Sequence, residues 1–179
     1  MLDYLLIGVE HILFGFDHLV FLFGLILVGG RLRSLVAVVT AFTLAHSVTL
    51  ATAVLGGWQP PAGVIEPLIA LSIAYVGVEN FFVRDAAKRW RITAPFGLVH
   101  GFGFAGALAD VGVPGDQVPL ALFLFNLGVE LGQLAALALV LPVLYALRRR
   151  GLFAERATRA LSLAVVALGV FWLVERLLS

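Results

Sequence analysis

The sequence contains no cysteine and few charged residues, and both shortages limit what the protein can be. Without cysteine there is no disulfide framework, no thiolate metal site and no cysteine nucleophile. Charged residues make up 13% of the 179 residues and hydrophobic residues 61%, whereas soluble domains average roughly 25% and 45–50%. A net charge of +1 gives no reason to expect nucleic acid as a partner. The composition predicts a membrane protein whose main partner is the lipid bilayer.

Six hydrophobic stretches are long enough to cross a bilayer, for which about 20 mostly apolar residues are needed. They cover approximately residues 4–29, 34–55, 64–83, 92–112, 117–147 and 159–178. The connections between them are short, so we expect antiparallel neighbours packed in a single transmembrane domain over residues 1–179. The predicted fold class is therefore an all-α polytopic membrane protein, a bundle of about six transmembrane helices.

The positions of the basic residues predict how this bundle is oriented. All but one of the 12 Lys and Arg residues lie in or beside the first, third and fifth connections, and Arg176 is the exception. By the positive-inside rule these connections face the cytoplasm and both termini are extracytoplasmic. We expect a multi-pass protein of the inner (plasma) membrane.

The first hydrophobic stretch contains four ionisable residues, Glu10, His11, Asp17 and His18. A charged side chain near the bilayer centre costs at least ~2.5–3.5 kcal/mol, so such a cluster indicates function. In an unbroken helix His11 and His18 would share a face but stand ~10 Å apart along the axis. Either they form two successive positions on a path, or Gly15 breaks the helix and brings them together.

The other two histidines, His46 and His100, are expected at a depth similar to that of His18, in the second and fourth spans. Ser47 follows His46 directly. The fifth span adds three polar residues on one helix face, at spacings of four and three: Asn126, Glu130 and Gln133. Glycines flank His100 and Glu130, including Gly97 and Gly128, and small residues allow another helix backbone to approach closely.

Histidine and carboxylate ligands without sulfur suit nickel, cobalt, zinc or copper(II). The predicted metal ligands are His11, Asp17, His18, His46 and His100, and the predicted supporting or path residues are Glu10, Ser47, Asn126, Glu130 and Gln133. The alternative interpretation is a buried polar network that joins helices without an ion. Glu130 could be a ligand, a proton acceptor or only a partner of its polar neighbours.

The arrangement H-x-x-x-G-x-D-H in the first span, with Ala45-His46-Ser47, the run from Leu98 to Phe104 and Asn126-Leu127-Gly128-Val129-Glu130, resembles the HupE/UreJ family of small membrane proteins. The resemblance covers the first five spans. It implies a nickel or cobalt permease in which His11, Asp17 and His18 handle the metal. Ile12 stands where hydrogenase-type members have proline. Five residues separate His11 from Asp17, where the larger nickel/cobalt transporters have four. Both differences point to a divergent branch of the family.

Two functions from different classes fit these residues. One is a permease for a divalent transition metal, with nickel or cobalt as the first candidates and no enzymatic activity. Because the chain is small for a rocking transporter, we expect a facilitated path or a homo-oligomer. The other is an intramembrane zinc-dependent hydrolase, with histidine ligands and Asp17 or Glu130 as general base. A metal-binding chaperone or sensor is a third interpretation.

Overall fold

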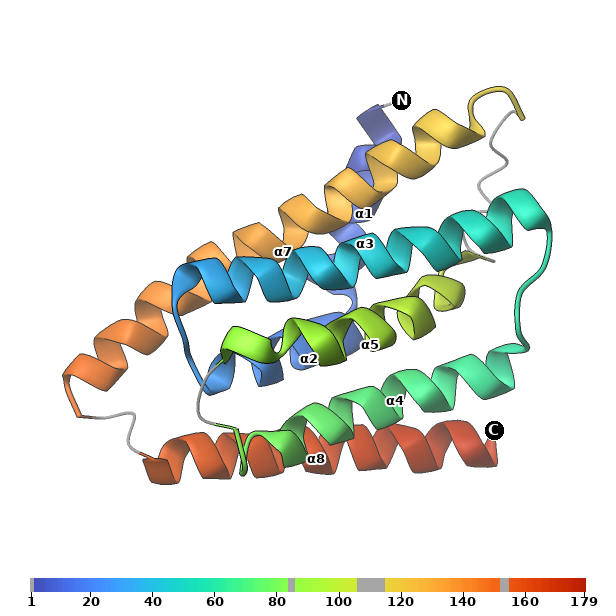
Figure 1. Ribbon diagram of the computed structural model, residues 1–179. Coiled ribbons are helices and arrows are strands. Elements are labelled where there is room, and N and C mark those ends of the chain that lie inside the picture. The colour runs from blue at the N-terminus through green and yellow to red at the C-terminus, as the bar shows by residue number, and fades with distance from the viewer. Residues whose placement is uncertain (1, 84–85, 106–114, 152–154) are drawn as a thin grey trace.

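The computed structural model describes residues 2–83, 86–105, 115–151 and 155–179, and all the regular structure in these ranges is helical (Figure 1). The elements are α1 (Leu2–Phe14), α2 (Phe16–Leu27), α3 (Leu32–Gly56), α4 (Ala62–Glu79), the short 3-10 helix η1 (Ala86–Lys88), α5 (Trp90–Gly103), α7 (Val118–Arg149) and α8 (Glu155–Leu178). The all-α prediction is confirmed.

Four helices, α3, α4, α7 and α8, are long and apolar enough to cross a membrane, and α1 with α2 makes a fifth candidate if the bent pair is one span. These five correspond to five of the six predicted stretches. In the predicted fourth stretch, the helix α5 has 14 residues and residues 106–112 lie outside the described part of the chain. The count of six spans therefore stays a prediction. The predicted third stretch extends to residue 83, but α4 ends at Glu79.

The helices pack in closely fitted pairs, α1 with α7, α3 with α5 and α4 with α8 (Figure 1). Glycine permits the first two contacts. A Cβ atom at Gly128 would collide with the carbonyl oxygen of Leu5 in α1, and one at Gly97 would collide with the carbonyl oxygen of Phe42 in α3. The close approach expected at both glycines is confirmed. Apolar side chains fill the space between the pairs, with Ile12, Phe42 and Phe125 fully buried.

Helices α3, α5 and α8 run in one direction, and α4 and α7 run in the other (Figure 1). The end of α2, the start of α3, the end of α7 and the start of α8 lie at one end of the bundle, together with the end of α4 and the start of α5. This is the end that carries most of the basic residues. The antiparallel arrangement agrees with the predicted topology, while the side of the membrane that each end faces remains a prediction.

One of these basic residues, Arg89, is buried and not a solvated loop cation. Its side chain is 1% exposed. The guanidinium donates through Nε to Oε2 of Glu79 at 2.8 Å and through Nη1 to the carbonyl oxygen of Leu25 at 2.8 Å. Arg89 thereby joins the ends of α2, α4 and α5 at the basic end of the bundle.

The first predicted span is broken at Gly15, and α1 and α2 are bent by 66° to one another. Gly15 has an extended backbone, with φ −77° and ψ 95°. Its amide donates to the carbonyl oxygen of His11 at 3.1 Å and ends α1, while its carbonyl oxygen accepts from the amide of Leu19 at 3.0 Å and begins α2. Of the two arrangements that the sequence left open, the structure has the broken helix.

Candidate metal centre

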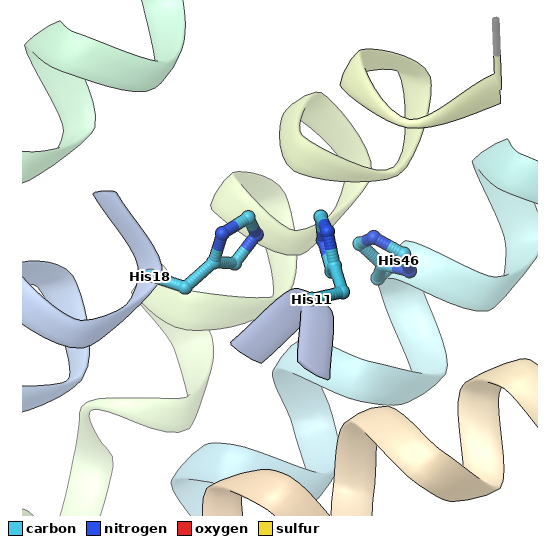
Figure 2. Close-up of side chains that lie close together, drawn as sticks. All are labelled: His11, His18 and His46. Atoms are coloured by element: carbon cyan, nitrogen blue, oxygen red, sulfur yellow. The ribbon is translucent and has the colours of Figure 1, made fainter. Parts of the chain in front are cut away.

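Three histidines from three helices meet beside the break. His11 lies in the last turn of α1, His18 in the first turn of α2 and His46 in the middle of α3 (Figure 2). One ring nitrogen from each lies within 4.8 Å of the others. The 66° bend brings the rings of His11 and His18 to a centroid distance of 4.4 Å, in place of the ~10 Å expected along a straight helix.

Gly15 is required for this arrangement because of what surrounds its Cα atom. A Cβ atom there would collide with the carbonyl oxygen of His11 and would stand 3.0 Å from Nδ1 of His18. The glycine therefore both ends α1 and leaves room for one of the three imidazoles.

His100 of α5 lies beside this group, next to His18. Its Nδ1 lies 3.4 Å from Nε2 of His18. The four rings form a row in the order His46, His11, His18 and His100, with successive centroid distances of 6.1, 4.4 and 5.1 Å. All four histidines named from the sequence are thus brought together.

The hydrogen bonds of Asn126 assign the proton of His46. The side-chain amide of Asn126 donates to the carbonyl oxygen of Leu122 at 2.8 Å, so its Oδ1 is the atom that accepts from Nδ1 of His46 at 3.2 Å. Neutral His46 then has its lone pair on Nε2. This Nε2 and the Nε2 of His11 are buried and have no hydrogen-bond partner among the described residues. Buried nitrogens without partners need an explanation, and metal binding supplies one.

Ser72 assigns the proton of His100 in the same way. The Ser72 hydroxyl donates to the carbonyl oxygen of Ile69 at 2.6 Å, so its oxygen accepts from Nε2 of His100 at 2.9 Å. Nδ1 of His100 is then an acceptor that faces His18. Ser72 was not identified from the sequence, where nothing relates a serine of α4 to a histidine 28 positions away.

A cavity of about 550 Å³ leads to His11, His18 and His100, and Asp17 and Arg176 also line it. Asp17 does not belong to the three-histidine group. Its Oδ2 instead accepts from Nη2 of Arg176 at 2.6 Å. One feature of the sequence singles out Arg176, because it is the basic residue that lies apart from the basic connections.

The remaining predicted residues lie between α3 and α7, with one exception. Glu130 accepts from the Thr40 hydroxyl at 2.6 Å, and Gln133 lies 2.9 Å from the hydroxyl of Thr43. A second cavity, of about 440 Å³, has a largely apolar lining that includes Leu44 and Phe123, together with five polar residues of the two helices: Thr40, Thr43, Ser47, Asn126 and Glu130. Glu10 is exposed on α1 and lines neither this cavity nor that of the histidines.

The comparisons with known proteins give the family. A family model described as HupE / UreJ protein matches residues 1–176, which is nearly the whole chain. No match was found among the curated proteins or among the solved structures. The extent of the match shows that this chain belongs to the HupE/UreJ family.

Proposed function

We propose that the protein is a membrane permease for a divalent transition-metal ion, with nickel or cobalt as the first candidates. The observation that carries the proposal is the group of His11, His18 and His46, whose ring nitrogens lie within 4.8 Å of one another beside a cavity. Imidazole nitrogen without sulfur is the ligand type that suits these metals. The HupE/UreJ family is itself associated with nickel and cobalt transport, which supports the same cargo.

The row of imidazoles suits movement of an ion as well as binding. A divalent ion needs ligands that replace its hydration shell among apolar helices, and transport needs several sites of moderate strength rather than one tight site. The ring centroids of successive histidines in the row from His46 to His100 lie 4.4 to 6.1 Å apart. An ion could therefore exchange ligands one at a time.

In this proposal the cavity that contains Asp17 and Arg176 is the entry. Asp17 would bind the ion transiently, releasing Arg176, before the ion reaches His18. The paired guanidinium keeps the carboxylate from being an isolated charge while no ion is bound, which lowers the cost of its partial burial.

The convergence of three imidazoles also supports the second candidate, a zinc hydrolase, because three protein ligands and an open position are the usual catalytic zinc set. That chemistry needs a general base within hydrogen-bond reach of the bound water. The carboxylates that line the histidine cavity are Asp17 and Glu66. Asp17 is paired with Arg176 and Glu66 is exposed, so the arrangement favours transport.

Uptake by liposomes that contain the purified protein and an entrapped metal-quenched dye tests the proposal. We expect His18→Ala and His46→Ala to abolish Ni²⁺ and Co²⁺ uptake, since each removes one imidazole of the row. Thr52→Ala, at an exposed position of the same helix as His46, is the control and should transport normally. Wild-type uptake by His46→Ala would contradict the proposal. Zinc-dependent cleavage of reporter esters or peptides by the wild type, without uptake, would favour the hydrolase.

A further inference from the structure

We propose that Glu130 anchors a second site for the divalent cation, built from oxygen ligands and lying beyond His46 from the other members of the imidazole group, which consists of His11, His18 and His46. The inference rests on the proposed function, because it gives the same cation a further position inside the protein. Four observations carry it: an unpaired carboxylate oxygen, a cavity, a shared histidine and the order of polar residues along two helices.

Only one of the two carboxylate oxygens of Glu130 has a hydrogen-bond partner among the described residues. Oε1 accepts from the hydroxyl of Thr40 at 2.6 Å, while Oε2 is buried and has no hydrogen-bond partner. None of the ion pairs in the described residues includes Glu130. A carboxylate within an apolar helix is costly unless it is neutralised or paired, and a bound cation would provide the missing charge at Oε2.

The surroundings of Glu130 supply further ligands. The cavity of about 440 Å³ beside it has a largely apolar lining, and its polar lining residues besides Glu130 are Thr40, Thr43, Ser47 and Asn126. Carboxylate, hydroxyl and amide oxygens bind nickel or cobalt less strongly than imidazole does. A weaker site after a stronger one is what release of a transported ion requires.

His46 connects the two sites. Its Nδ1 bonds to Oδ1 of Asn126 at 3.2 Å, and Asn126 lines the cavity of Glu130. The same ring belongs to the imidazole group, with its Nε2 free of hydrogen bonds. One imidazole thus separates the nitrogen ligands from the oxygen ligands, so an ion has only a single side chain to pass.

The polar residues continue from His46 in one direction. Along α3 they are Thr43 and Thr40, and along the antiparallel α7 they are Asn126, Glu130 and Gln133. Both series run toward the end of the bundle that carries most of the basic residues (Figure 1), which the positive-inside rule assigns to the cytoplasm. The second site therefore lies on the inward side of the imidazole group.

Equilibrium binding of Co²⁺ to the purified protein tests the second site without requiring transport. We expect two ions per chain for the wild type, and one for Glu130→Gln, which removes the charge but keeps the shape. His11→Ala should also bind one ion, because it weakens the imidazole group and leaves Glu130 intact. The matched control is Glu175→Gln, an exposed position on α8, which should bind two.

A second variant allows the inference to be tested even if Glu130→Gln does not fold. Thr40→Val should lower the affinity of the weaker site by about tenfold or more, as loss of a supporting hydrogen bond does at metal sites, and should leave the stronger site unchanged. Two ions bound to Glu130→Gln, or one ion bound to the wild type, would overturn the inference. So would loss of the imidazole site in folded Glu130→Gln, because Glu130 would then be part of that site.

Uptake by liposomes separates this inference from the proposed function. A wild type that binds two ions but transports none would contradict the permease and leave the second site standing. A wild type that transports the ion but binds only one ion per chain would contradict the second site and leave the permease standing. If both hold, Glu130→Gln should keep the spectrum of Co²⁺ bound by imidazole while its uptake falls by about tenfold or more.

Discussion

Oδ2 of Asp17 and Nη2 of Arg176 lie 2.6 Å apart, so the last helix of the chain holds the acid of the first-span motif. The two side chains are 22% and 19% exposed, and both line the cavity that leads to the histidines. Nη1 of Arg176 also donates to the carbonyl oxygen of Glu66 at 3.1 Å. Arg176 therefore connects α8 to the start of α2 and to α4 at the mouth of the site.

Replacing this arginine should change stability and metal affinity in opposite directions. Arg176→Gln leaves Asp17 without its ion-pair partner, and for a pair of intermediate exposure we expect a loss of about 1–3 kcal/mol in the free energy of unfolding. The variant also removes a positive charge near the histidines and frees a carboxylate, so Co²⁺ should bind more tightly. Thermal unfolding in detergent and Co²⁺ titration measure the two effects.

The control for this prediction is Arg159→Gln, which breaks the exposed pair with Glu155 on the same helix. In Arg159→Gln, neither the free energy of unfolding nor the Co²⁺ affinity should change by more than a small amount. Unchanged stability together with unchanged affinity in Arg176→Gln would show that the pair with Asp17 has no role at the site.

Much of this arrangement could be predicted from local features of the sequence. Long apolar stretches predict transmembrane helices, because a helix needs about 20 mostly apolar residues to cross the hydrocarbon core of a bilayer. Glycines at positions 97 and 128 predict close helix contacts, which the structure contains. The similar depth of His18, His46 and His100 predicts that they meet, because short connections force neighbouring helices side by side.

Other features depend on which distant residues meet, and hydropathy and spacing do not encode that. Asp17 has a partner 159 positions away. A glycine within an apolar stretch is compatible with a straight helix or with a break, so His11 could not be placed relative to His18. Arg89 looks like other loop cations in the sequence and is nevertheless buried against Glu79.

Gly15→Ala should disturb the metal centre. The added methyl group would collide with the carbonyl oxygen of His11 and press on the ring of His18, so we expect a loss of about 1–3 kcal/mol in stability and weaker Co²⁺ binding. Gly63→Ala is the matched control, because nothing lies within 4 Å of a Cβ atom there. That variant should be neutral or stabilising by about 0.5–1 kcal/mol. Equal behaviour of the two variants would refute the role given to the break.

Asn126 should act on metal binding through His46. Asn126→Leu removes the acceptor that holds the proton of His46 on Nδ1, and loss of such a partner typically weakens metal affinity by about 10–100-fold. Asn126→Asp keeps an acceptor oxygen and should retain most of the affinity. Calorimetric titration with Ni²⁺ distinguishes the variants, and equal affinities in both would argue against this orientation of His46.

Arg89→Met should be among the most destabilising changes at the basic end of the bundle. It leaves Glu79 without its buried partner, and breaking one side of a buried ion pair costs about 3–5 kcal/mol. The matched variant Arg159→Met affects a pair whose side chains are 63% and 73% exposed, so it should cost no more than about 1 kcal/mol. Denaturant unfolding of the purified variants measures both. A small effect at Arg89 would contradict its assigned role as the joint of three helices.

The most direct test of metal binding by the three imidazoles is X-ray absorption at the nickel edge, with one equivalent of Ni²⁺ bound to the purified protein. Scattering from several imidazole rings around the metal, reduced by one ring in His46→Ala and unchanged in Thr52→Ala, is the result expected if His11, His18 and His46 bind the ion together. A spectrum with oxygen ligands alone, or one that His46→Ala leaves unaltered, would contradict it.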